Sequence, residues 1–184
     1  CLVTVDNFES DEFSNKTTLT IAAGAGNDQI HLNNPNKPTG LTAIVVNGGD
    51  PTAAYNDTLI VNGIPGIADD LRTQTTGTAA GNVIDTAAAF VPVTYTGVEA
   101  LSIVGQTADG DGLRVGDTAG NDTVEYATGA TPDAGSITGS SSLGFSYVPL
   151  TFAGITAFVV PVSPVGGAND TLLVDGTVND DVIN

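Results

Sequence analysis

The sequence is short of the residues that cross-link a fold or attract anions. It has one cysteine, Cys1, and no methionine or tryptophan. A single thiol cannot form an internal disulfide, so packing alone must hold the fold. Only 4 residues are Lys or Arg against 21 Asp or Glu, which gives a formal net charge of -17. Phosphate backbones and anionic membranes repel such a chain, so nucleic-acid binding is excluded and cations are the expected small partners.

Long apolar runs are also missing. No run approaches the length that spans a bilayer, so no membrane-crossing segment is predicted. The position of Cys1 has two interpretations. A mature bacterial lipoprotein begins with a lipid-modified cysteine, and the alternative is a chain that starts there as a processed or excised segment.

What is present favours β-strands. Hydrophobic residues make up 41% of the chain, so it has material for a core and is not an acidic disordered tail. Thr, Val and Gly are abundant, while the residues that favour helix surfaces are scarce. Alternating or short apolar segments bounded by Gly, Asn, Asp and Pro predict the following strands. They are 2–5, 17–22, 29–32, 43–46, 58–62, 91–95, 100–104, 123–126, 145–151, 157–162 and 171–174.

Two regions are less regular. Residues 73–89 are compatible with a strand at 82–85 or a helical turn at 86–90. Residues 127–142, rich in Gly and Ser, predict an exposed loop.

An internal repeat organises the chain. "GLTAIVV" from Gly40, "GVEALSI" from Gly97 and "GITAFVV" from Gly154 share one pattern, at intervals of 97 − 40 = 57 and 154 − 97 = 57. We therefore predict one all-β domain over 1–184, a repetitive β-solenoid or parallel β-helix-like stack of short strands. A β-sandwich with internal duplication is the alternative.

Asn-Asp pairs precede several of the predicted strands. The pairs begin at Asn27, Asn56, Asn121, Asn169 and Asn179. Asn and Asp side chains bond their own backbone and start turns without any metal, which is one interpretation. The other is a Ca²⁺ site, since calcium takes six to eight oxygen ligands and the charge favours cation binding. The candidate metal ligands are Asp28, Asp57, Asp109, Asp111, Asp117, Asp122 and Asp170.

The segment from Ala23 to His31, "AGAGNDQIH", resembles the nonapeptide of the RTX (repeats-in-toxin) family, Gly-Gly-x-Gly-x-Asp-x-apolar-x. Gly24, Gly26, Asp28 and Ile30 match, and Ala23 replaces the first glycine. With "VTYTGVEALSIVG", the turns also resemble haemolysin-type calcium-binding repeats of large secreted or surface bacterial proteins, including planctomycete ones. The resemblance implies Ca²⁺ between turns, an extracellular location and a structural or adhesive role. The intervals between the turn aspartates, 57 − 28 = 29, 122 − 57 = 65 and 170 − 122 = 48, exclude a continuous calcium-filled roll.

Catalysis is not predicted. His31 is the only histidine, and no nucleophile–base arrangement or phosphate loop can be built around it. We expect a non-enzymatic extracellular structural protein, a subunit or segment of a surface layer or self-assembling fibre, with an adhesin or carbohydrate-binding module as the alternative. The ending "VNDDVIN" looks like an unfinished strand that could pair with the next molecule, giving a head-to-tail homopolymer. Four N-x-[ST] motifs, at Asn15, Asn56, Asn121 and Asn169, are candidate glycosylation sites.

Overall fold

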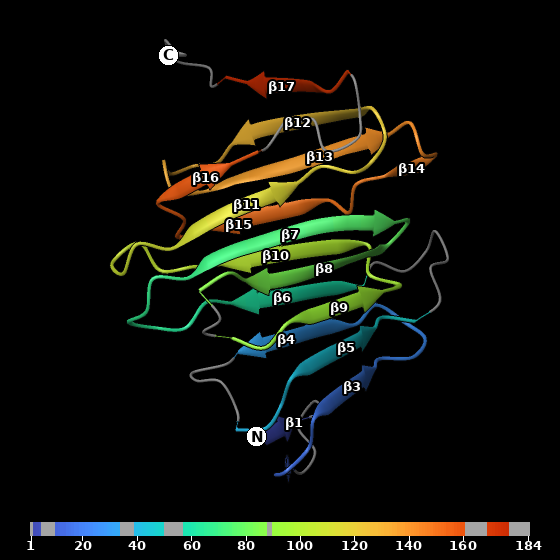
Figure 1. The fold of residues 1–184 in the computed structure, drawn as a ribbon, viewed down its shortest axis with the longest axis vertical. Coiled ribbons are helices and arrows are strands. Elements are labelled where there is room, and N and C mark those ends of the chain that lie inside the picture. Colours follow the sequence, from blue (N-terminus) through green and yellow to red (C-terminus); the bar gives the residue numbers. More distant parts are fainter. Residues whose placement is uncertain are drawn as a thin grey trace.

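The protein is all-β. The computed structural model describes residues 2–4, 10–33, 39–49, 57–87, 90–160 and 169–176. Within these ranges it contains strands and turns and no helix, and so no helix that could cross a membrane (Figure 1). A short hairpin of β1 (Leu2–Thr4) and β2 (Ser10–Glu12) is not paired with either of the two large sheets. Cys1, Asn56 and residues 177–184 lie outside the described residues.

The first large sheet, here sheet I, has seven strands. In spatial order they are β16 (Ala157–Val159), β11 (Gly112–Gly116), β7 (Asp70–Gly77), β8 (Ala80–Asp85), β9 (Val93–Thr96), β5 (Ala43–Asn47) and β3 (Thr18–Ala22). The second, sheet II, has eight. Their order is β17 (Thr171–Asp175), β12 (Asp122–Thr128), β13 (Gly135–Ser141), β15 (Leu150–Ala153), β10 (Ala100–Val104), β6 (Thr58–Asn62) and β4 (Gln29–Asn33), with β14 (Phe145–Ser146) beside β13.

The chain passes repeatedly from one sheet to the other. β3 in sheet I leads to β4 in sheet II, β5 returns to sheet I, and β6 goes back to sheet II. A strand that returns after visiting the other sheet runs parallel to its predecessor, as in the pairs β3/β5, β4/β6 and β6/β10. One passage through both sheets is called a coil below.

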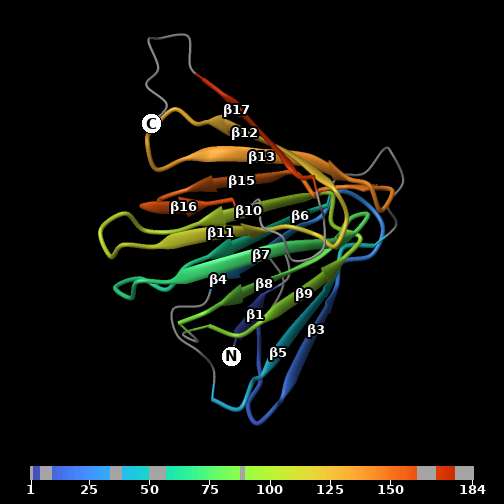
Figure 2. The same cartoon turned by 45° about the horizontal axis from the view of Figure 1, so that its top comes forward.

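Two insertions interrupt this alternation. β7, β8 and β9 follow one another within sheet I, and β12, β13 and β15 do so within sheet II, in antiparallel pairs. A strand that turns back through a short loop can only pair antiparallel. Because each insertion reverses direction twice, the strands after it run the same way as those before it. Figure 2 shows β17 and β12 at one end of the resulting stack and β3 and β5 at the other.

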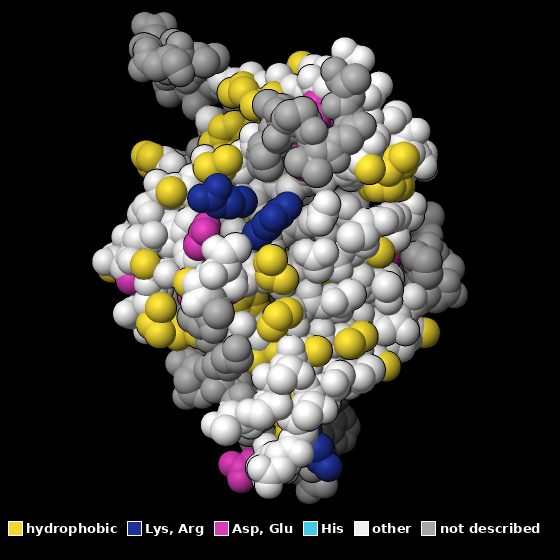
Figure 3. Space-filling model, viewed as in Figure 1, with side chains coloured by type: hydrophobic (Ala, Val, Ile, Leu, Met, Phe, Trp, Pro, Cys, Tyr) yellow, Lys and Arg dark blue, Asp and Glu magenta, His cyan; other side chains and the backbone are white. Residues whose placement is uncertain are grey.

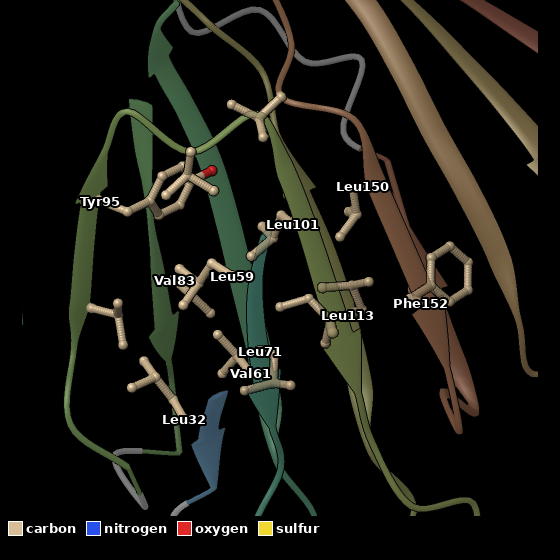
Figure 4. Close-up of a cluster of buried hydrophobic side chains, with 14 of the residues drawn as sticks. Leu32, Leu59, Val61, Leu71, Val83, Tyr95, Leu101, Leu113, Leu150 and Phe152 are labelled. Carbon is tan, nitrogen blue, oxygen red and sulfur yellow. The ribbon is translucent and has the colours of Figure 1, made fainter. Parts of the chain in front are cut away.

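The core lies between the two sheets. Inward positions alternate along each strand, so that Leu59 and Val61 of β6 are buried beside Leu101 and Ile103 of β10. Side chains of sheet I, including Leu71 of β7, face them (Figure 4). The same alternation in neighbouring strands such as β4, β6 and β10 builds apolar rows along the stack, because side chains on a strand alternate with a period of two.

An aromatic cluster closes the core near β17. Phe158 of β16 in sheet I stacks on Phe152 of β15 in sheet II, with ring centroids 4.6 Å apart. The ring centroid of Tyr126 in β12 lies 5.1 Å from that of Phe158. The three rings therefore join the two sheets where the inserted strands of sheet II meet β16.

The all-β prediction is confirmed, and several element predictions were wrong. Residues 127–142, expected as a loop, hold the end of β12 and the whole of β13. β7 and β11 were not predicted, and 145–151 is divided between β14 and β15. At 73–89 the strand alternative holds, as β8.

The interval of the sequence repeat differs from the pairing distances in the sheets. Gln29 faces Thr58 and Thr58 faces Ala100, so the separations along the chain are 58 − 29 = 29 and 100 − 58 = 42. The segments from Gly40 and Gly154 lead into β5 and β16 of sheet I, whereas that from Gly97 leads into β10 of sheet II. Equivalent positions of the repeat are therefore not paired with one another.

Candidate functional site

Acidic residues line the edge where the chain enters sheet II. The described strands that an Asn-Asp pair opens, β4, β6, β12 and β17, all belong to this sheet. The Asp28 N–H donates to Asp57 Oδ1 at 2.8 Å, and the Asp57 N–H donates to Glu99 Oε2 at 2.8 Å. Each acid thus receives the backbone N–H of the acid one coil earlier. We call this run of hydrogen bonds the corner ladder.

The corner ladder resumes beyond the insertion in sheet II. The Asp122 N–H donates to Asp170 Oδ1 at 2.9 Å. The Asp122 carboxylate, 2% exposed, accepts the Thr118 N–H at 2.6 Å and the Thr118 hydroxyl at 2.7 Å. Burial by itself would raise the pKa of Asp122, but these hydrogen bonds outweigh it and hold the pKa below its ordinary value.

Asp117 belongs to the same neighbourhood. Tyr147 is buried, which raises the pKa of its phenol, and the charges of Asp122, Asp117 and Asp170 raise it further. Tyr147 therefore stays neutral beside the three carboxylates. Asp117, Asp122 and Asp170 form one acidic group in space, although Asp170 is distant from the other two in sequence.

A second acidic group lies where the chain returns to sheet I. The Asp69 N–H donates to Asp111 Oδ1 at 2.8 Å. The Ile64 N–H donates to Asp69 Oδ2 and the Gln106 N–H to Asp111 Oδ2, both at 2.6 Å. Each carboxylate thus accepts a hydrogen bond from the backbone of its own turn. The Asp111 carboxylate also accepts one from Asp69 and so links two coils. We call Asp69, Asp109, Asp111 and Gln106 the return corner.

Electrostatic strain is concentrated at the return corner. Burial raises the pKa of Asp69 to about 6, and the charges of Asp111, Asp85 and Asp109 raise it further against the hydrogen bond from Ile64. Burial also raises the pKa of Asp111. Asp69 directly precedes β7, the first strand of an insertion. β7 pairs antiparallel with β8, and this pairing brings Asp85 near Asp69.

Glycines make room for these carboxylates. A Cβ on Gly63 would lie 2.8 Å from Asp69 Oδ2 and 3.0 Å from Asp111 Oδ2, and one on Gly105 would lie 2.8 Å from Asp111 Oδ2. A side chain at either position would force the carboxylates to move. At the corner ladder, a Cβ on Gly48 would lie 1.9 Å from the Gly97 carbonyl oxygen. The turns of successive coils therefore pack backbone against backbone.

Enclosed oxygen atoms without hydrogen-bond partners occur in all three acidic groups. They are Asp28 Oδ2, Asp57 Oδ2, Glu99 Oε1, Asp69 Oδ1, Gln106 Oε1, Asp109 Oδ1 and Asp117 Oδ2. Buried polar atoms are usually paired, so each is an acceptor in need of a donor or a cation. No set of three or more His, Cys, Asp or Glu side chains in the described ranges has the geometry of a metal centre.

The structure thus sorts the seven predicted ligands into three places. Asp28 and Asp57 lie together with Glu99. Asp109 and Asp111 lie with Asp69, and Asp117, Asp122 and Asp170 form the third group. The predicted ligands did not include Asp69, although Asp69-Asp70 is visible in the sequence as an acidic pair, and they did not include Glu99. A signal existed for Asp69, because Gly63 and Asp69 have the same separation along the chain as Gly105 and Asp111.

Those other singled-out residues that the structure describes lie at the surface. His31 points outward from β4, as its alternation with Ile30 and Leu32 predicted. Asn15, Asn121 and Asn169 are exposed, and their glycosylation stays a prediction.

Comparisons with known proteins add no further assignment. No family model, no curated protein and no solved structure matches the chain. The class that fold and site define is an acidic, two-sheet all-β protein with carboxylate-lined corners.

Proposed function

We propose that the protein is a non-enzymatic structural unit of an extracellular surface layer or self-assembling fibre, built as a β-solenoid-like stack. The observation that carries this is the corner ladder, since its hydrogen bonds run from coil to coil along the stack. These hydrogen bonds join successive coils directly and need no bound ligand. This is expected for a repeat architecture in which each coil contacts only its neighbouring coils. The resemblance to repeats of secreted bacterial proteins supports the extracellular location.

Electron microscopy of the purified protein tests the proposal. Filaments or sheets that form from the isolated chain are the expected result. Monomers at every concentration up to the millimolar range would contradict it. Saturable binding to one glycan on an array would instead favour the adhesin class.

The proposal includes stabilisation by Ca²⁺, with the return corner as the favoured site. Asp69 Oδ1, Gln106 Oε1 and Asp109 Oδ1 are enclosed there without partners, and carboxylate and amide oxygens are ligands that Ca²⁺ accepts. A cation would also offset the burial and, to a lesser extent, the repulsion between carboxylates that raise the pKa of Asp69. The family resemblance points to turn aspartates in the same role.

A thermal melt tests the calcium proposal. After chelation, millimolar Ca²⁺ should raise the Tm, and Asp109→Asn should reduce that rise because it removes one charged ligand. Asp70→Asn is the matched control, since Asp70 lies on the outer face next to Arg114. An unchanged Tm on adding Ca²⁺ to the chelated wild type would rule the site out.

A further inference from the structure

Two basic side chains lie in register on the outer face of sheet I. Arg72 of β7 faces Arg114 of β11 across one parallel step, and both residues are outward and exposed. They are two of only 4 Lys or Arg residues in the chain. Like charges directly opposite one another destabilise a sheet. An anion bound between the two guanidinium groups would therefore stabilise this part of the fold.

One carboxylate of the chain contacts this pair. Asp70 of β7 is the one acid at the outward positions of the described sheet I strands. The Arg114 Nε–H donates to Asp70 Oδ1 at 3.2 Å, and the Thr86 hydroxyl donates to Asp70 Oδ2. The bond from Thr86, more than the Arg114 guanidinium, lowers the pKa of Asp70 against its partial burial. Asp70 is thus ionised at neutral pH and holds Arg114 by a single N–H.

The remaining guanidinium donors have no acceptor among the described residues. Arginine carries five N–H donors in a planar fork that matches the two oxygens of a carboxylate. Arg114 uses one of them on Asp70, and Arg72 makes no ion pair in the described part of the chain. Figure 3 shows the basic side chains of this face next to each other, with an acidic one beside them. Because neighbouring strands are about 4.8 Å apart, one oxyanion can contact both groups.

The pair is accessible and rests on a rigid part of the sheet. The Arg114 side chain is 54% exposed and that of Asp70 is 41% exposed. β7 and β11 each have a neighbouring strand on both sides, and their inward residues Leu71 and Leu113 are fully buried. Side chains on packed strands hold a binding geometry better than side chains on loops.

We propose that Arg72 and Arg114 form a binding site for a carboxylate, carried by a small di-acid or by an acidic side chain of a second copy. Two cations and one anion leave a single positive charge at the site, in a chain with a net charge of -17. The site therefore suits a ligand with one or two negative charges. A nucleic acid carries one charge about every 1.7 Å of duplex and would need a longer basic track than the described strands of this face offer.

Titration of the full chain with malonate, a small di-acid, tests the site by NMR. The Nε–H resonances of Arg72 and Arg114 should shift and saturate while NaCl keeps the ionic strength constant. Arg72→Gln should raise the Kd for malonate about tenfold or more, because it removes charge-assisted hydrogen bonds. Lys16→Gln, which removes the same charge from an exposed residue before β3, is the control and should leave the Kd unchanged. Shifts that rise linearly and equal those given by chloride would overturn the site.

A thermal melt separates binding from folding. Without malonate, Arg72→Gln should have a Tm no lower than that of the wild type, because the repulsion between the two guanidinium groups is gone. Malonate should then raise the Tm of the wild type more than that of Arg72→Gln. An equal rise in both chains would contradict binding at the pair.

Sedimentation velocity identifies the source of the carboxylate. If a second copy supplies it, Arg72→Gln/Arg114→Gln should need about tenfold or more protein to assemble than the wild type, and malonate should inhibit assembly of the wild type. Assembly that neither change affects would assign the site to a free acid. A wild type that never assembles would refute the proposed function, whereas the malonate titration decides the site independently.

Discussion

At the scale of single residues, buried carboxylates act as connectors. Asp57 and Asp111, 1% and 0% exposed, each accept an N–H from another coil. A hydrogen bond to a charged group typically stabilises the fold by about 1.5–3 kcal/mol, more than a neutral hydrogen bond does. The same burial makes any unneutralised carboxylate costly, and the return corner is where the two effects compete.

Asp69→Asn should stabilise the protein at pH 7 in calcium-free buffer. The pKa of Asp69 is about 6 in the folded protein against an ordinary 3.8, so the folded state binds its proton more tightly. The free energy of unfolding therefore falls as the pH rises from about 4 to about 6. Asparagine still accepts the hydrogen bond from the Ile64 N–H but carries no charge. We therefore expect the free energy of unfolding at pH 7 to rise by about 1–2 kcal/mol.

Denaturant unfolding at pH 5 and pH 7 measures this effect. The advantage of Asp69→Asn over the wild type should shrink at pH 5, where Asp69 is protonated in the folded state. Some pH dependence remains in the variant, because the pKa of Asp111 is also raised. A variant less stable than the wild type at both pH values would show that Asp69 is compensated by a contact beyond the acidic cluster.

Gly105→Ala should destabilise the return corner. The added Cβ would lie 2.8 Å from Asp111 Oδ2, 2.8 Å from the Gly154 carbonyl oxygen and 2.9 Å from Ile155 Cδ1. Crowding of this kind costs about 1–3 kcal/mol. Gly77→Ala is the control, since nothing lies within 4 Å of its Cβ position. Equal free energies of unfolding for the two variants would contradict the close approach of the coils.

At the scale of elements, a central strand such as β10 has one face in the core and one face outside. Leu101→Ala in β10 should reduce the free energy of unfolding by about 2–5 kcal/mol, because it opens a cavity between the sheets. Ser102→Ala, the next residue and outward, should change it by no more than about 0.5 kcal/mol. Urea unfolding of both variants checks the alternation, and a reversed order would mean that β10 has the opposite face inward.

Elements with a local signal were predictable from the sequence, and those without one were not. The Asn-Asp turns located β4, β6, β12 and β17 because the turn chemistry and the apolar alternation lie in the same few residues. β13, "GSITGSS", has one buried large apolar side chain, Ile137, and its glycines and serines are typical of a loop. The segment is a strand because it pairs with β12 on one side and β15 on the other.

Long-range proximity was likewise not readable from the sequence. The aspartates at 28, 57, 122 and 170 were identified as turn residues, but their order along the stack depends on which strands pair. Glu99 joins the corner ladder because β10 pairs with β6, and no Asn-Asp signal marks it. The return corner forms only because β7 pairs with β11, which makes the loops before these two strands adjacent.

At the scale of the whole molecule, net charge opposes assembly. Two copies with a formal charge of -17 each repel one another, and salt shortens the range of that repulsion from about 30 Å at 10 mM to about 8 Å at 150 mM. Raising NaCl from 10 to 500 mM should therefore increase the fraction of sedimenting polymer at fixed protein concentration. A decrease with salt would indicate that attraction between unlike charges holds the copies together.

The two insertions have a consequence for the geometry of the stack. Each adds a pair of strands to one sheet only, and one insertion falls in each sheet, so both main paths have seven strands. Since neighbouring strands are about 4.8 Å apart, one insertion alone would lengthen one wall by about 10 Å and tilt the end coil. The second insertion, in the other sheet, makes the two sheets equal in length again. The two insertions therefore keep the two sheets equal in length along the stack. Removing either hairpin alone should bend the axis of the stack more than removing both.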